Sequence, residues 1–285
     1  MEDRLIAIVP TPPGVRLSSD DIVRAMRAFI GPADGEPVVA RTEQTQANSF
    51  VVTIGGASVA ALSFPHRVPD ETVASAIGNE LFWNDAAKAF ASAAGHVLLA
   101  VLNPVNDPAR TVRQSRALTL VTAAALESMQ GTGVFWSPAD CVIDPPRFRT
   151  EAMDLRAAEY ASPLWFSIRF FPGSPDPKSE MLVCQSTGLA VFLGRELECG
   201  PYLMPPMEMA KTVLGVARYM ASAGPIFADG HTFGFGETQS KDACLRVARS
   251  SRGGIDRPIF RLELMAQEAQ AAPARSWWRG RAASQ

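Results

Sequence analysis

Short apolar runs alternate with amphipathic segments through the first half of the chain. The apolar runs typical of strands are Leu5–Val9, Val51–Ile54, Val59–Leu62, His96–Leu102 and Val134–Trp136. Amphipathic segments typical of helices begin near Ser18, Asp70, Asp85 and Asp107, residue types that cap the free N–H groups of a helix. Gly55-Gly56 joins two of the apolar runs and predicts a β-hairpin, because both glycines can take a positive φ.

The second half is predicted to combine strands with one long helix. The runs typical of strands are Leu164–Phe171, Met181–Cys184, Leu189–Leu193 and Pro258–Leu264. Met207–Ala223 has an apolar face and predicts a helix that ends at Gly224-Pro225.

These patterns define a fold class and a division of the chain. We expect an α+β protein with two packed α/β layers and mixed sheets. A polar segment opened by Pro145-Pro146 separates the halves and places a boundary near residues 150–162. The predicted units are an N-terminal α/β subdomain (1–150), a C-terminal α+β subdomain (151–265) and a poorly ordered tail (266–285).

Composition limits the classes of partner. The 285 residues are 47% hydrophobic and 20% charged, which is typical of a globular protein. The 27 basic and 29 acidic residues give a net charge of −2, so nothing in the charge favours nucleic acid or an anionic membrane surface. The uncharged run Gln44–His66 is divided by Gly55-Gly56, so we interpret it as two strands and not as a membrane span.

Cysteine usage and the N-terminus predict a cytoplasmic protein. Cys141, Cys184, Cys199 and Cys244 are few and irregularly spaced, which fits reduced thiols better than a disulfide scaffold. The first apolar run is short and ends at Pro10, whereas a signal peptide needs a longer apolar stretch and a cleavage site.

Strong catalytic motifs are absent from the sequence. It contains no Walker phosphate loop, no HExxH pair and no GxSxG nucleophile turn. Gly234-Phe235-Gly236 lacks the third glycine of a dinucleotide fingerprint. We therefore expect neither a cofactor nor a bound metal.

Four residues remain as weak catalytic candidates: His96, Glu196, Asp229 and His231. Asp229 and His231 flank Gly230, so they could form an acid–base or metal corner, or an ordinary turn that favours Asp and Gly. His96 opens an apolar run, where a histidine commonly makes a structural hydrogen bond at a strand edge.

The candidate binding residues are basic or aromatic: Trp83, Arg110, Arg113, Arg116, Trp136 and Arg169. The three arginines of residues 110–116 recur every third position of a predicted helix, and could hold an acidic partner or form a solvated face. The tryptophans lie near element ends, where they could line a pocket or pack in the core.

Several segments, taken in order, resemble one bacterial family. They are 76-AIGNELFWNDAA-87, 96-HVLLAV-101, 134-VFW-136, 163-PLWF-166, 187-TGLAVFLG-194, 196-ELE-198 and 224-GPIFADGHTFG-234. Together they resemble the family catalogued as domain of unknown function 4261, over about Leu5 to Leu264. The chain departs from that pattern at Ala93, where the resemblance implies a second histidine three residues before His96.

The resemblance implies a bacterial, cytoplasmic protein and carries no established activity. We therefore expect a non-enzymatic protein-binding module, of the immunity or adaptor kind, which recognises its partner by surface complementarity. The alternative is an enzyme or small-ligand binder with a site between the two halves around Asp229 and His231, joined by His96, Arg169 and Glu196. A third hypothesis, nucleic-acid binding, requires Arg110, Arg113, Arg116, Arg147 and Arg149 to form one basic patch.

Overall fold

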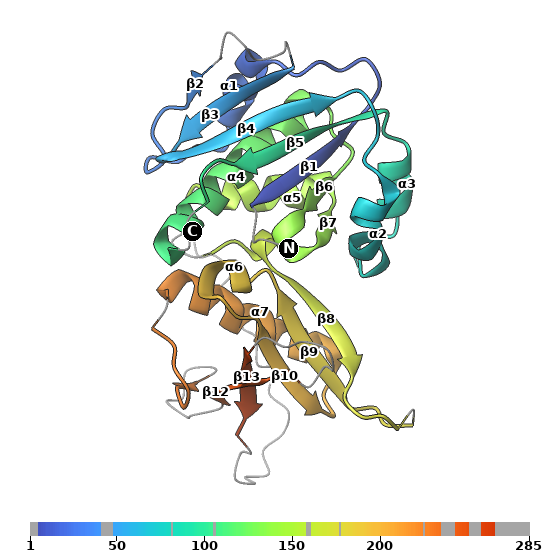
Figure 1. The fold of residues 1–285 in the computed structure, drawn as a ribbon, viewed down its shortest axis with the longest axis vertical. Helices are drawn as coiled ribbons and strands as arrows, with labels where there is room; N and C mark the ends of the chain where they lie inside the picture. The colour runs from blue at the N-terminus through green and yellow to red at the C-terminus, as the bar shows by residue number, and fades with distance from the viewer. Residues whose placement is uncertain are drawn as a thin grey trace, which may run out of the picture.

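Two β-sheets with helical layers make up the fold (Figure 1). The computed structural model describes residues 5–40, 48–80, 82–104, 107–157, 161–176, 178–224, 226–234, 243–250 and 258–265. The predicted α+β class is confirmed.

The first sheet is antiparallel in every pairing among the described residues, where seven strands follow the order β2-β3-β4-β5-β1-β6-β7. The strands are β1 (Ile6–Thr11), β2 (Val38–Ala40), β3 (Ser49–Ile54), β4 (Ala57–Phe64), β5 (Gly95–Val101), β6 (Val134–Trp136) and β7 (Cys141–Ile143). The predicted hairpin at Gly55-Gly56 is confirmed as β3–β4, and both glycines have a positive φ.

The second sheet is mixed, with six strands among the described residues in the order β11-β12-β13-β10-β9-β8. The strands are β8 (Ser167–Pro172), β9 (Leu182–Thr187), β10 (Leu197–Tyr202), β11 (Thr232–Phe233), β12 (Ala243–Arg249) and β13 (Pro258–Leu264). Only β10 and β13 run parallel among the described pairs. The last strand has the bounds that the sequence predicts.

The helices connect and cover these sheets. They are α1 (Ser19–Met26), α2 (Asp70–Gly78), α3 (Ala86–Ala91), α4 (Pro108–Ser128), α5 (Pro145–Asp154), α6 (Ala190–Leu193) and α7 (Pro206–Ala223), with the 3-10 turns η1 (Ser137–Ala139) and η2 (Pro163–Trp165). Ser18 caps α1 and Asp107 caps α4 through their side chains, as the sequence predicts.

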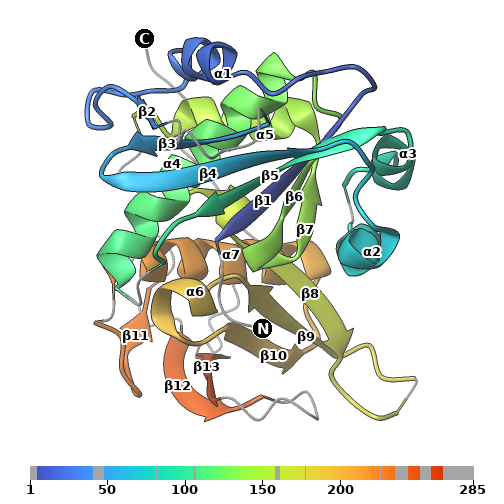
Figure 2. The same ribbon diagram turned by 45° about the horizontal axis from the view of Figure 1, so that its top comes forward.

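Helix α4 is the centre of the core. It lies on the inner face of the first sheet, where it contacts β1, β4 and β5, and it also contacts α6 and α7 from the second half (Figure 2). Most of its residues from Gln114 to Leu126 are buried. One hydrophobic cluster therefore joins side chains of both sheets.

Two predicted strands differ from the structure. Leu189–Leu193 is not a strand, because Gly188 and Gly194 take positive φ values of 104° and 71° and the residues between them form α6. The predicted strand Leu164–Phe171 starts only at Ser167, because Ser162 caps the η2 turn before it.

The passage between the two sheets runs through α5 and η2, in the region of the predicted boundary. The predicted tail, 266–285, lies outside the described residues. Among the helices of the described residues, none combines the length and the apolar character needed to cross a membrane.

Gly188 gives a test of the α6 turn. A Cβ at Gly188 would overlap the carbonyl oxygen of Trp165, whereas a Cβ at Gly194 would meet nothing within 4 Å. Gly188→Ala should lower the free energy of unfolding by about 3 kcal/mol or more, and Gly194→Ala by about 1–2 kcal/mol for its backbone conformation alone. Guanidinium denaturation measures both losses, and equal losses would contradict the described packing.

Candidate functional site

The contacts of His96 hold its side chain in place within the first sheet. Its side chain is buried on β5, its Nδ1 lies 2.7 Å from the carbonyl oxygen of His66, and its ring stacks on Phe64 with centroids 4.9 Å apart. Burial lowers the pKa of His96 and favours the neutral ring. The contacts are those of a histidine held at a strand end.

Glu196 holds the start of α6. Its carboxylate accepts hydrogen bonds from the Ser186 hydroxyl at 2.6 Å and from the backbone N–H groups of Gly188, Leu189 and Ala190 at 2.9–3.2 Å. Burial raises the pKa of Glu196, while these four hydrogen bonds act in the opposite direction. All of these contacts lie within residues 186–196, so Glu196 stabilises the start of α6, where the sequence predicts a strand.

Asp229 and His231 form an exposed turn at the edge of the second sheet. The Asp229 carboxylate accepts a hydrogen bond from the Val247 N–H at 2.9 Å and lies 3.7 Å from Arg246. Gly230 has a positive φ of 86°, and Nδ1 of His231 bonds the Ala228 N–H at 3.4 Å. The structure therefore gives Asp229, His231, Glu196 and His96 separate local partners and does not bring them into one cluster.

The three arginines of α4 differ in their exposure and in their partners. Arg110 and Arg113 are exposed, whereas Arg116 binds the buried carboxylate of Asp34 through Nε and Nη2. Asp34 also accepts the Gly31 N–H at 2.7 Å. Arg116 thus ties α4 to the segment after α1.

The tryptophan candidates divide between core and surface. Trp136 is fully buried on β6 beside Phe148, with ring centroids 6.4 Å apart. Trp83 is half-buried and packs against Phe90. Phe82, next to Trp83, is 64% exposed, and its N–H donates to the Glu80 carboxylate at 2.7 Å.

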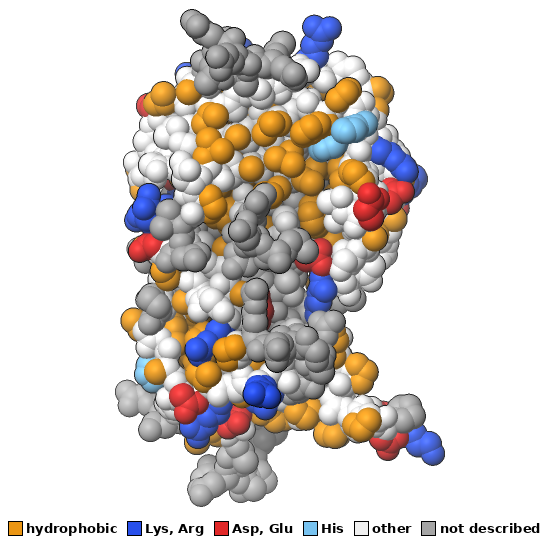
Figure 3. Space-filling model, in the orientation of Figure 1, with side chains coloured by type: hydrophobic (Ala, Val, Ile, Leu, Met, Phe, Trp, Pro, Cys, Tyr) orange, Lys and Arg blue, Asp and Glu red, His pale blue; other side chains and the backbone are white. Residues whose placement is uncertain are grey.

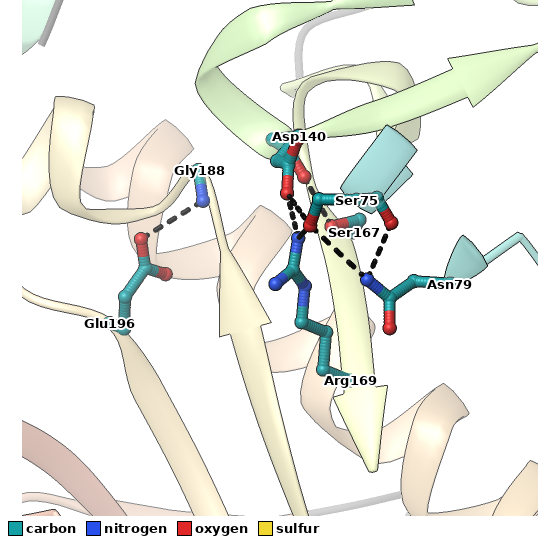
Figure 4. Close-up of polar contacts among 8 residues, drawn as sticks. Ser75, Asn79, Asp140, Ser167, Arg169, Gly188 and Glu196 are labelled. Carbon is teal, nitrogen blue, oxygen red and sulfur yellow. Dashed lines mark hydrogen bonds and ion pairs between the residues drawn. The ribbon is translucent and has the colours of Figure 1, made fainter. Parts of the chain in front are cut away.

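Arg169 is the centre of a polar junction between the two halves (Figure 4). Its Nη2 donates to Asp140 after η1 and lies 3.4 Å from the Ser75 hydroxyl of α2. Ser75 also donates to Asp140 at 2.8 Å, and Asn79 donates to the Ser75 carbonyl at 2.6 Å. Arg169 is a candidate from the sequence, whereas Asp140, Ser75 and Asn79 are not, because they lie on other elements that are far from Arg169 along the chain.

A polar row crosses the outer face of the second sheet. Direct strand pairing places Arg169, Gln185, Glu198 and Arg261 side by side across β8, β9, β10 and β13. The fully buried Glu198 bonds Arg261 at 3.1 Å and Ser250 at 2.6 Å. These contacts pair the buried charge, as such groups require.

The first sheet has a different outer face. Strand pairing places Val51, Ala60, Ala100 and Ile6 in one row across β3, β4, β5 and β1, all pointing away from α4. Leu62 and Leu98 pair in the next row. Figure 3 shows the resulting gathering of hydrophobic side chains over these strands.

Among the described residues, helices cover only part of that outer face. The part over β1, β6 and β7 packs in a second hydrophobic cluster with α2 and α3. The part over β2–β5 has half-buried apolar residues at Val51, Ala60, Leu62, Leu98 and Ala100. At its edges Val38 is 63% and Leu102 is 39% exposed. We define the open face as the apolar residues Val51, Ala60, Leu62, Leu98 and Ala100 of this part together with Ile6 of β1, which lies at its border and also packs against the second cluster.

The open face is not among the binding surfaces that the sequence predicts. Its sequence indication was the uncharged run Gln44–His66, which we assigned only to strands. Apolar residues at both alternating sets of positions would have predicted a strand with two apolar faces.

The comparisons with known proteins give one match. Residues 185–257 match the model of a family described as Domain of unknown function (DUF4261), which confirms the predicted resemblance for that segment. The matched segment covers the end of β9 and all of α6, β10, α7, β11 and β12. No curated protein and no solved structure showed a significant match to the chain.

Among the described residues, no group of three His, Cys, Asp or Glu side chains is placed to hold a metal ion.

The Asp34–Arg116 pair predicts a pH dependence of stability. Burial alone would raise the pKa of Asp34, but the Arg116 and Gly31 hydrogen bonds outweigh it and lower the pKa below its ordinary 3.8. The pair therefore stabilises the fold above pH 3.8, and this contribution declines as the pH falls through the lower folded-state pKa.

Asp34→Asn should lower the free energy of unfolding by about 1–3 kcal/mol at pH 7, with a smaller difference from the wild type near pH 3. Asp21→Asn removes the exposed pair with Arg24 and should change stability by less than about 0.5 kcal/mol. Denaturation curves from pH 7 to pH 3 check both variants. A pH-independent loss in Asp34→Asn would contradict this account.

The Arg169–Asp140 junction predicts a measurable coupling between the halves. The two side chains are 19% and 31% exposed, so solvent screens them only in part. A double-mutant cycle with Arg169→Ala and Asp140→Ala should give a coupling energy of about 1–2 kcal/mol. The exposed pair Arg67–Asp70 is the control and should give less than about 0.5 kcal/mol. Similar coupling in the two cycles would show that the junction is only a surface contact.

Proposed function

We propose that this protein is a non-enzymatic protein-binding module of the bacterial cytoplasm, of the immunity or adaptor kind. We further propose that it binds its partner on the open face of the first sheet. The observation that supports this proposal is the set of uncharged apolar side chains on the outer face of β3, β4, β5 and β1, beside the helices α2 and α3.

The chemistry of the open face favours association with protein. Burial of apolar surface contributes about 25 cal/mol per Å², so covering such a face supplies a driving force for association. Contiguous apolar patches at a protein surface commonly mark interaction sites. The six residues of the open face are all aliphatic, which favours an apolar contact surface on the partner.

Three of the charged candidates, Arg116, Arg169 and Glu196, support the same proposal because they are bonded within the fold. Asp34 with Arg116, Asp140 with Arg169, and Glu198 with Arg261 each form a pair inside the protein. Glu196 is bonded to the loop before α6. These groups hold the fold together, which favours recognition through the apolar open face over catalysis by the charged residues.

Capture of the tagged protein at native expression, followed by mass spectrometry, tests the proposal. We expect one stoichiometric partner, whose recovery falls at least tenfold in Leu98→Lys and Val51→Lys because each variant places a charge on the open face. Met207→Lys is the matched control, since Met207 is 53% exposed on α7 in the second half.

A parallel capture with a chain that lacks residues 269–285 asks whether the C-terminal segment takes part. Circular dichroism and thermal melting establish that each variant is folded. Absence of any stoichiometric partner would contradict the binding-module proposal. Equal recovery by wild type and both open-face variants would contradict the assigned surface.

A further inference from the structure

We infer that His66 and His96 together form a site for a divalent transition-metal ion, of the kind that imidazole nitrogens bind. The inference goes beyond the proposed function and does not depend on the partner. The sequence predicts no bound metal, because the two histidines are 30 residues apart and match no ligand spacing. The fold brings them together: Phe64 of β4 pairs with His96 of β5, and His66 lies in the bend that follows β4.

The hydrogen bond of His96 leaves one of its ring nitrogens for a metal ion. Nδ1 lies 2.7 Å from the carbonyl oxygen of His66. Because a carbonyl oxygen only accepts, Nδ1 of the neutral ring carries the proton and Nε2 keeps a free lone pair. Histidines that bind metals are commonly oriented in this way, by an acceptor at the other ring nitrogen. Burial favours the neutral form of His96, which is the form that binds a metal.

The surroundings of His96 fix its ring and leave Nε2 accessible. The ring lies 4.9 Å from Phe64 and 5.4 Å from His66, measured between centroids. Among the described residues, Nε2 has no hydrogen-bond partner, and it is not one of the buried side-chain atoms that lack one. Figure 3 shows histidine side chains at the border of the hydrophobic gathering over the first sheet. A metal ion could therefore reach Nε2 from solvent.

His66 supplies the second ligand at a suitable separation. In tetrahedral zinc sites the metal–nitrogen distance is about 2.0–2.1 Å, which puts the centroids of two bound imidazoles about 5 Å apart. The rings of His66 and His96 are 5.4 Å apart and are inclined by 26°. His66 is exposed, and its ring nitrogens have no hydrogen-bond partner among the described residues, so its ring can turn toward Nε2 of His96.

The two nitrogen ligands select the class of ion. Neutral imidazoles suit Zn²⁺, Cu²⁺ and Ni²⁺, whereas Mg²⁺ and Ca²⁺ prefer oxygen ligands. In the part of the chain that the structure describes, no third His, Cys, Asp or Glu joins the pair. The site would therefore keep open positions for water or for a ligand from another molecule. The neighbouring charge of Arg67 is paired with Asp70 at 2.9 Å.

A Zn²⁺ titration of the full chain, without a polyhistidine tag, tests the inference. Calorimetry measures the affinity, and NMR of ¹⁵N-labelled imidazoles identifies the nitrogens that bind. We expect one Zn²⁺ per chain, shifts of Nε2 of His96 and of one nitrogen of His66, and no response to Mg²⁺. His66→Gln should weaken Zn²⁺ binding at least tenfold, because the ion loses one of two linked ligands. His231→Gln is the matched control and should leave the affinity unchanged, since His231 is exposed in the second half.

Several outcomes would overturn the inference. Absence of Zn²⁺ binding, or equal affinity in the wild type and His66→Gln, would show that the pair is not a metal site. A shift of the His66 nitrogens without a shift of His96 would show binding to a single surface histidine. Thiolate charge-transfer absorption on addition of Co²⁺ would assign the ion to the cysteines. Circular dichroism establishes that both variants are folded, and the NMR readout on the wild type needs no substitution of the buried His96.

Discussion

Burial of α4 is the constraint on which the rest of the structure depends. The helix lies on the inner face of the first sheet and also contacts α6 and α7, so it needs small or apolar side chains around most of its circumference. Ala123, Ala124 and Ala125 meet that need, and the Trp165 Nε1–H donates to the buried Thr119 hydroxyl at 2.9 Å. Both halves therefore share one core.

This arrangement decides which surface is left for recognition. Because α4 and α1 take the inner face, β3, β4, β5 and β1 present their second apolar face outward, beside α2 and α3. The ion pairs have a different role. Arg116 with Asp34, and Arg169 with Asp140, join segments 82 and 29 residues apart and hold the layers in position. The charged groups thus maintain the shape of the protein, and we assign recognition to the aliphatic face.

The sequence predicts correctly those elements whose conformation depends on residues close by in the chain. The Gly55-Gly56 hairpin, the Asp107-Pro108 start of α4 and the helix ended by Gly224 depend on capping or on glycine conformation within a few residues. The prediction for Leu189–Leu193 was wrong because residues that flank the run decide its conformation: Gly188 and Gly194 take a positive φ, and the Glu196 carboxylate accepts the N–H groups of Gly188 and Ala190. An apolar run of five residues carries no periodicity that separates a strand from a helix.

The candidate site was less predictable because it depends on pairing between strands. Arg169 was selected from the sequence, but its partners Asp140 and Ser75 come from η1 and α2. The open face needs the register of four strands before Val51, Ala60, Ala100 and Ile6 become neighbours. A shift of one residue in any strand would turn its side chains to the other face.

Hydroxyl-radical footprinting of the isolated protein and of its partner complex tests the central claim most directly. Oxidation of Leu62 and Leu98 reports on the open face, and oxidation of Met207 reports on the second half. We predict that Leu62 and Leu98 are oxidised in the isolated protein and protected at least fivefold in the complex, with Met207 unchanged. Unchanged oxidation of both leucines in the complex would show that the partner binds elsewhere.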